Sequence, residues 1–216
     1  GRVTGSATAL GGGATLLVGV ILFLLGDLTI STMGIVLLVG ASTWAIATWV
    51  FSHVEEPVPE GKQEGIDKSW WSDTWKLFTD DAQFRNFVIV RALLLVSALS
   101  TAFIVLLHDD LSGVFGFVIA SGLASLIGGL VSGVFSDKSS KNTMAAGAAA
   151  SSVIILLIVA SSHWASDAVN AWVMPLGFFA VNLAHTAVRV ARKTYVVDMA
   201  GGDKRTQYVG AANTMM

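Results

Sequence analysis

The sequence predicts an all-α integral membrane protein. Hydrophobic residues make up 54% of the 216 residues, charged residues make up 13%, and the mean hydropathy is +0.70. A water-soluble domain carries about 25% charged residues, so this composition excludes a soluble enzyme. The net charge of −2 gives no basic excess with which to bind nucleic acid. Because the chain has no cysteine, it holds no disulfide, zinc-thiolate site or cysteine nucleophile.

Six complete transmembrane helices and the start of a seventh are predicted from the apolar stretches of the chain. A crossing takes about 20 mostly apolar residues, and such stretches lie at 7–26, 28–50, 86–107, 111–135, 142–162 and 168–188. The seventh begins near Thr206, a few residues before the chain ends at Met216. Since the chain also opens at Gly1 rather than at a methionine, we expect it to be a fragment of a longer protein.

Basic residues sort onto one side of these predicted spans. All lysines and arginines except Arg91 fall at 1–6, 51–85, 136–141 and 189–206, whereas the alternate connections hold none. Cytoplasmic loops carry an excess of lysine and arginine. We therefore expect 51–85, 136–141 and 189–206 to be cytoplasmic, and the protein to be integral to a plasma membrane, a bacterial inner membrane.

The long connection 51–85 has two parts. Residues up to Ser69 combine prolines, glycines and charges, which is typical of a flexible linker. An amphipathic helix is predicted at about 70–83, because apolar side chains recur at helical spacing at Trp71, Trp75, Phe78 and Ala82. Two interpretations of this helix stay open: a lid or coupling element on the inner membrane surface, or a connector anchored in lipid.

A stripe of small residues runs along the fourth predicted span. Ser121, Ser125, Gly129 and Gly133 recur every four residues, and Asp137 takes the next place. Small side chains let a neighbouring helix approach closely, which is how helices associate in lipid. We therefore predict helix packing at Ser121, Ser125 and Gly129.

The stripe leads into a short cytoplasmic turn that carries a motif. The turn reads GVFSDKSSK and contains Gly133, Asp137, Lys138 and Lys141. Its spacing resembles the signature loop of the major facilitator superfamily (MFS), Gly-x3-Asp-[Arg/Lys]-x-Gly-[Arg/Lys], with Ser140 where that family has glycine. The family carries this loop between its second and third helices, and a degenerate copy between its eighth and ninth. The departure at Ser140 fits the degenerate copy.

The resemblance implies an MFS-type twelve-helix bundle, of which this chain covers about helices five to eleven. Residues 1–50 would be the last two helices of the N-terminal half, and 51–85 the linker between the halves. Residues 86–216 would be the truncated start of the C-terminal half. The missing helices of the parent chain would then complete the cavity, and the isolated chain would transport nothing.

The resemblance further implies a secondary active transporter, a permease that carries a small solute by alternating access and is driven by a gradient of protons or sodium. Such folds bind their substrate near the midplane of the lipid bilayer. The alternative function is a membrane scaffold or sensor that shares the fold and transports nothing. The sequence separates these two functions only through the polar groups inside the spans.

The resemblance assigns gating to four residues of the turn: Gly133, Asp137, Lys138 and Lys141. By the family's pseudo-symmetry, Asp137 would lie against the start of the first span, near Gly5, Ser6 and Ala7. A helix N-terminus carries a partial positive charge that favours a nearby carboxylate. In the alternative interpretation, Asp137 caps its own turn and the two lysines face lipid phosphates.

Four polar residues inside or beside the predicted spans are candidates for substrate binding or proton coupling: Arg91, Asn182, His185 and Arg189. Arg91 would bind an anionic substrate or a carboxylate, or else snorkel to the cytoplasmic interface. The other three form a polar stripe below Pro175, which should interrupt the last complete span. His185 would either titrate and couple to protons, or form a hydrogen bond where two helices meet.

Nothing in the sequence predicts an enzyme, a cofactor or a metal site. The four histidines lack metal-ligand spacing. Adjacent His108, Asp109 and Asp110 are more typical of a turn than of a metal site or proton relay. Without a phosphate-binding Gly-x4-Gly-Lys-[Ser/Thr] motif, ATP-driven transport has no support in this sequence.

Overall fold

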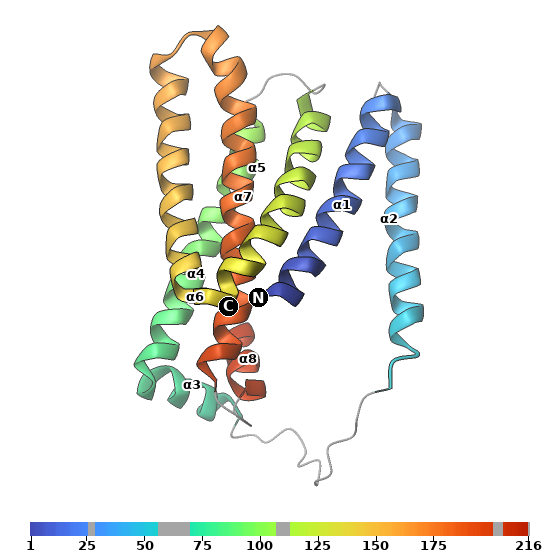
Figure 1. Cartoon of the computed structure of the whole chain (residues 1–216). Coiled ribbons are helices and arrows are strands. Elements are labelled where there is room, and N and C mark those ends of the chain that lie inside the picture. The colour runs from blue at the N-terminus through green and yellow to red at the C-terminus, as the bar shows by residue number, and fades with distance from the viewer. Residues whose placement is uncertain (26–28, 56–69, 107–112, 201–204, 216) are drawn as a thin grey trace. The chain divides into compact units, whose positions relative to one another are not determined.

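A computed structural model describes residues 1–25, 29–55, 70–106, 113–200 and 205–215, and over these residues the chain forms helices and no strand (Figure 1). In chain order the helices are α1 (Arg2–Leu25), α2 (Ile30–Phe51), α3 (Trp70–Asp80), α4 (Ala82–Ala98), α5 (Ser100–Leu106), α6 (Gly113–Trp164), α7 (Asp167–Met199) and α8 (Arg205–Thr214). The predicted all-helical fold class is confirmed.

Five helical segments within the described ranges are long and apolar enough to cross a membrane: Arg2–Leu25, Gly34–Phe51, Ala82–Leu106, Phe115–Trp164 and Asp167–Met199. The fourth has 50 residues. A straight helix of that length would measure about 75 Å, against a hydrocarbon core of about 30 Å. The exact count of six spans and the start of a seventh stays a prediction.

Helix α6 is folded back on itself at Ser139. This residue has φ −163° and ψ 100°, an extended backbone conformation inside an otherwise helical segment. The chain reverses direction there, and α7 runs beside the two resulting arms (Figure 1). We call residues 113–138 the first arm of α6 and residues 140–164 its second arm. The turn between them carries the motif described above.

Large apolar side chains fill the space between α5, α6 and α7 far along the arms from Ser139. Phe117 and Phe178 meet edge to face, with ring centroids 4.7 Å apart. Helix α7 continues through Pro175 without a break, although we expected an interruption there. Its neighbours Met174 and Phe178 are buried in this core. Their packing keeps the segment helical even though proline removes one backbone hydrogen bond.

A second apolar core joins α3, α4, α7 and α8. Its buried members are Phe84, Phe87, Val88, Val196, Ala211 and Ala212. Phe84 is fully buried, and the ring of Tyr208 meets it edge to face at 5.4 Å between centroids. The short helix α8 is therefore held to α4 and α7 by apolar packing.

The predicted amphipathic helix is present as α3, but it ends at Asp80 rather than at 83. Asp81 caps the next helix, because its carboxylate accepts hydrogen bonds from the backbone N–H groups of Gln83 at 2.8 Å and Phe84 at 3.0 Å. Aspartate is a favoured N-cap residue. The span expected from 86 therefore lies in a helix that starts at Ala82, and Ala82 does not belong to the amphipathic face.

The face of α3 that packs on the protein contains Thr74, which is buried, and Leu77 and Phe78, which lie against the second core. Trp71 and Trp75 are exposed. The tryptophans are thus available to a membrane surface, as both interpretations of this helix require.

The chain divides into two compact units, Gly1–Leu24 with Trp71–Met216, and Leu25–Trp70. The second unit contains α2, whose large apolar side chains are exposed along its described length. Polar side chains on α2 bond to its own backbone: Ser42 donates to the carbonyl of Leu38, and Thr48 to that of Trp44. Such internal bonding is required of a helix that lies in lipid. The predicted domain boundaries stay a prediction.

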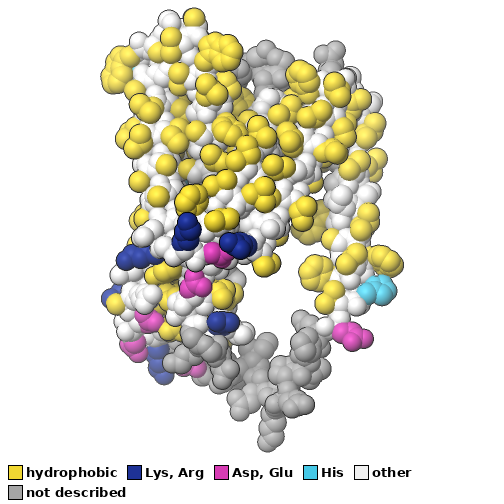
Figure 2. Space-filling view, viewed as in Figure 1, with side chains coloured by type: hydrophobic (Ala, Val, Ile, Leu, Met, Phe, Trp, Pro, Cys, Tyr) yellow, Lys and Arg dark blue, Asp and Glu magenta, His cyan; other side chains and the backbone are white. Residues whose placement is uncertain are grey.

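Charged side chains are unevenly distributed over the molecule. On the face shown in Figure 2, hydrophobic side chains cover the arms of α6 and much of α7, whereas lysine, arginine and acidic side chains gather towards the end where α3 and α8 lie. One charged end beside a long apolar surface is the distribution expected of a helical membrane protein. Which side of the membrane this end faces stays a prediction.

Candidate functional site

Helix α1 packs against the first arm of α6 through glycines. A Cβ atom added to Gly129 would lie 2.6 Å from the carbonyl oxygen of Gly5 and 2.7 Å from the backbone nitrogen of Ala9. On α1, a Cβ added to Gly12 would lie 2.8 Å from the Cβ of Ser125. The two backbones therefore touch, which only glycine permits. Ser125 and Gly129 of the predicted stripe lie in this contact.

Further along the arm, the contact is made by Gly122, which the four-residue spacing did not predict. A Cβ at Gly122 would lie 2.7 Å from the Cα of Leu16. Gly122 falls one residue after Ser121, because the helical repeat of 3.6 residues drifts away from a strict period of four. Gly133, at the other end, is within 3.3 Å of the Cα atoms of Arg2 and Gly5 by the same measure.

Asp137 lies at the start of α1. One carboxylate oxygen is 2.8 Å from the nitrogen of Gly1, and the other accepts a hydrogen bond of 3.2 Å from the backbone N–H of Arg2. The Nε of Arg2 is 3.4 Å from the same oxygen. The contact is about one turn earlier than the expected position beside Gly5, and Gly5 itself lies against Gly133.

The turn itself is capped by other residues. The hydroxyl of Ser139 accepts a hydrogen bond from the backbone N–H of Asn142 at 3.2 Å, and Thr143 donates to the carbonyl of Ser139 at 2.9 Å. Lys138 and Lys141 are exposed, and the Nζ of Lys138 is 5.9 Å from the centroid of the Phe135 ring. Asp137 thus reaches α1, while Ser139 caps the second arm.

Ser140, at the position where the MFS motif has glycine, ties the turn to α7. Its side chain is buried, and its hydroxyl lies 2.8 Å from a carboxylate oxygen of Asp198 and 3.0 Å from the carbonyl oxygen of Ser136. The hydroxyl has one proton to donate, so the two acceptors share it. We did not predict this contact, although the departure from the motif at Ser140 was the available signal.

Arg91 binds α8. Its Nη1 donates to the carbonyl of Ala212 at 3.0 Å, and its Nη2 donates to the side-chain oxygen of Asn213 at 2.9 Å. Its Nε is buried and has no hydrogen-bond partner among the described residues. These contacts are with the protein itself, so an anion or carboxylate partner and snorkelling to the interface both stay predictions for Arg91.

The polar stripe on α7 has two kinds of member. Asn182 donates to the carbonyl of Phe178 on its own helix at 2.9 Å. His185 has a buried Nε2 that makes no hydrogen bond within the described part of the chain. Arg189 lies one turn further along α7 and is exposed.

Arg192 extends the stripe and brings it to Arg91. It is partly buried and lies within electrostatic range of Arg91 and Arg189. The sequence did not single out Arg192 among the basic residues that follow the last complete span. We call Arg91, His185, Arg189 and Arg192 the cationic cluster, a set drawn from α4 and α7 beside α8.

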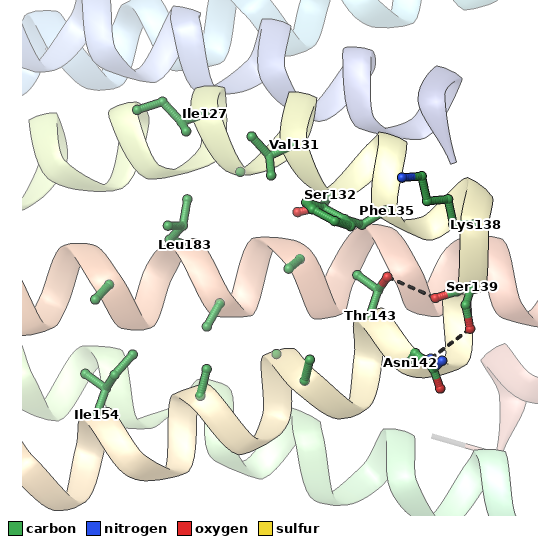
Figure 3. Close-up of a pocket in the computed structure, with 17 residues that line it drawn as sticks. Ile127, Val131, Ser132, Phe135, Lys138, Ser139, Asn142, Thr143, Ile154 and Leu183 are labelled. Atoms are coloured by element: carbon green, nitrogen blue, oxygen red, sulfur yellow. Dashed lines mark hydrogen bonds between the residues drawn. The ribbon is translucent and has the colours of Figure 1, made fainter.

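A cavity of about 690 Å³ lies between the two arms of α6 and α7 (Figure 3). Its walls are formed mainly by small and apolar side chains. Lys138, Ser139, Asn142 and Thr143 line the end nearest the turn. We call this cavity the α6 groove.

The comparison with known protein families decides what kind of protein carries these features. A family model described as Major Facilitator Superfamily matches residues 1–216, the whole chain. The chain belongs to the Major Facilitator Superfamily. The resemblance inferred from the turn between Gly133 and Lys141 is thereby confirmed. No match was found among curated proteins or among solved structures.

The superfamily is a family of membrane transporters and not of enzymes. Among the residues that the structure describes, no three histidine, cysteine, aspartate or glutamate side chains gather where they could hold a metal ion. The His108, Asp109 and Asp110 turn lies outside the described residues. Asp137 and the cationic cluster are therefore the candidate machinery of a superfamily member.

Proposed function

We propose that the protein is a secondary active transporter that carries a small solute by alternating access and is driven by a gradient of protons or sodium. Membership of the superfamily supports transport as the class of function. The observation that carries the mechanism is the contact of Asp137 with the nitrogens of Gly1 and Arg2, because it joins α6 to the start of α1 at one end of their glycine contact.

The Asp137 contact is suited to a gate that opens and closes. The Asp137 side chain is 39% exposed, so water can solvate its carboxylate when the contact breaks. An exposed ion pair adds little to stability. Beside it, Gly5 and Gly129 meet backbone to backbone, so no bulky side chains have to disengage when the helices move. These properties favour rocking of α1 against α6 over a permanent lock.

We further propose that the cationic cluster lines the path of the solute. A charge inside a span is costly unless it is paired. Arg91 Nε and His185 Nε2 are buried with no hydrogen-bond partner in the described part of the chain. An anionic solute would supply an acceptor for Arg91 Nε, and for His185 Nε2 when that nitrogen carries a proton, which makes small organic anions and phosphate the first class to test. A proton bound at His185 would add to the attraction.

The test is uptake by the intact protein that contains this sequence, reconstituted in liposomes loaded with the pH-sensitive dye pyranine. The solutes offered are monocarboxylates, inorganic phosphate, neutral sugars and primary amines, each with and without a proton or sodium gradient. We expect the anions to accumulate only while a gradient is present. If folded protein accumulates no solute under any gradient, the scaffold or sensor function replaces the transporter.

The gate has its own variant in the same assay. Asp137→Asn removes the charge from the α1 contact, and Asp167→Asn, an exposed aspartate at the other end of the second arm, is the matched control. We expect uptake to fall strongly in the first variant and to stay unchanged in the second. Equal uptake by both variants would contradict the proposed gating role of Asp137 but would not contradict the proposal that the protein is a transporter.

A further inference from the structure

The α6 groove exists because three helix faces present small residues to one another. Gly128 comes from the first arm, Ala146 and Ala150 from the second arm, and Ala180 and Ala187 from α7. Larger side chains close its far end, where Ile127, Ile154 and Leu183 lie (Figure 3). Its volume of about 690 Å³ is within the range of about 300–1,000 Å³ that ligand cavities occupy.

The length of the groove corresponds to one leaflet of a bilayer. Along the first arm it extends from Lys138 to Ile127, and along the second arm from Asn142 to Ile154. At 1.5 Å per residue these stretches measure about 16 Å and about 18 Å. Half of a hydrocarbon core of about 30 Å is about 15 Å. The groove therefore extends from the turn to about the middle of the membrane.

The two ends of the groove differ in chemistry. The end at the turn is lined by Lys138, Ser139, Asn142 and Thr143, and no acidic residue is among those that line the groove. The hydroxyls of Ser139 and Thr143 are engaged in bonds of the turn, whereas Lys138 and Asn142 are exposed at its mouth. The other end holds aliphatic side chains alone (Figure 3).

The groove also opens sideways on the apolar surface of the helices. Ile127, Val131 and Phe135 line it and are 38%, 49% and 55% exposed. These residues belong to a segment apolar enough to span a membrane. A molecule could therefore enter from the lipid without crossing the protein, provided that it is apolar along its length and anionic or polar at one end.

We propose that the α6 groove binds one anionic phospholipid of the leaflet at the turn. The phosphate lies at Lys138 and Asn142, and one acyl chain lies along the groove towards Ile127 and Ile154. The charge of Lys138 selects an anionic headgroup, and the length of the groove selects a chain that reaches the bilayer midplane. This site is separate from the cationic cluster and does not depend on the proposed transport.

The experiment uses the intact protein in nanodiscs that contain phosphatidylcholine and a phosphatidylglycerol with a photoreactive diazirine near the end of one acyl chain. After irradiation, peptide mass spectrometry locates the crosslinks. We expect crosslinks at Ile127, Ile154 and Leu183, reduced about fivefold by Lys138→Gln and unaffected by Lys141→Gln. Free inorganic phosphate should not compete, because it lacks the chain; competition would assign the end at the turn to a free anion and overturn the lipid proposal.

A second pair of variants tests the groove without changing any charged residue. Ala150→Phe places a ring in the groove from an exposed position, whereas Ala149 is also exposed on the same arm but does not line the groove, so Ala149→Phe is the control. We expect the first variant alone to abolish the crosslinks. Crosslinks that are spread evenly over the apolar surfaces would overturn the proposal. So would a lack of crosslinks in the wild type, because it would mean that another helix or a second copy covers the groove.

Discussion

The hydroxyl of Tyr208 donates a hydrogen bond of 2.6 Å to the carboxylate of Asp81, across 127 residues of sequence. The same carboxylate caps α4 by accepting from the backbone N–H groups of Gln83 and Phe84. One aspartate therefore starts a membrane helix and fixes α8 against it. The edge-to-face contact between Tyr208 and Phe84 reinforces this junction from its apolar side.

Asp81 should make the stability of this junction depend on pH. The hydrogen bond from Tyr208, followed by the backbone N–H of Phe84, lowers the pKa of Asp81 below its ordinary value. A carboxylate with a lowered folded-state pKa stabilises the fold above its unfolded pKa of about 3.9, and this contribution is lost as the pH falls through the folded value. The midpoint temperature of thermal unfolding in detergent should therefore fall less for Asp81→Asn than for wild type when the pH is lowered from about 5 to about 3.

Two further variants separate the roles of Asp81. Tyr208→Phe removes only the long-range bond and should cost about 1.5–3 kcal/mol, because the acceptor is a charged carboxylate. Asp81→Ala removes the cap as well and should cost about 0.5–2 kcal/mol in addition. Equal unfolding free energies for the two variants would show that the cap contributes nothing.

Gly129→Ala should separate α1 from α6. The added methyl would lie 2.6 Å from the carbonyl oxygen of Gly5, and a backbone atom cannot move aside alone. Overpacking of this kind costs about 1–3 kcal/mol. Gly11→Ala is the control, because a Cβ there meets nothing within 4 Å and alanine favours a helix over glycine by about 1 kcal/mol. The midpoint temperature of thermal unfolding should therefore fall for Gly129→Ala and stay the same or rise for Gly11→Ala.

Ser140→Gly should loosen the turn from α7, although it restores the residue that the superfamily motif has. The variant loses the bond of 2.8 Å to Asp198. A hydrogen bond to a charged group contributes about 1.5–3 kcal/mol, and the exposure of Asp198 places this one at the lower end. A double-mutant cycle of Ser140→Ala with Asp198→Ala measures the coupling. A coupling energy of zero would contradict a bond between the two side chains.

The membrane-spanning helices could be predicted from sequence, because a bilayer demands long apolar segments whose backbone groups bond internally. Pseudo-symmetry of the superfamily, rather than local pattern, predicted that Asp137 lies against the first span, but near Gly5 and not at Gly1 and Arg2, where the contact is. The start of α4 was not predicted, because the amphipathic repeat of α3 continues into the apolar stretch with no glycine or proline between them. Only the capping geometry of Asp81 marks the break.

Contacts between distant residues escaped prediction for a different reason. Arg91 finds its acceptors 121 and 122 residues away, on α8. Local sequence shows that a buried arginine needs a partner but not which helix supplies it. Likewise, the spacing of small residues predicted a close contact between helices. It did not predict Gly122 as part of that contact, because the helical repeat drifts away from a period of four residues. Register between helices is set by packing in three dimensions, which one-dimensional periods only approximate.

The orientation of the chain can be tested with single cysteines, because these 216 residues contain none. Lys141→Cys lies at the turn of α6, and Asp167→Cys lies beyond the second arm, residues 140–164. That arm measures about 37 Å at 1.5 Å per residue, enough to cross a hydrocarbon core of about 30 Å. The two cysteines should therefore face opposite sides of the membrane.

Positive residues at the turn predict that Lys141→Cys is cytoplasmic. A membrane-impermeant maleimide added to intact cells that express the protein should label Asp167→Cys only, and should label both variants once the membrane is permeabilised. Labelling of Lys141→Cys alone in intact cells would invert the orientation. Labelling of both would mean that the second arm does not cross the membrane, and the leaflet assigned to the α6 groove would then be wrong as well.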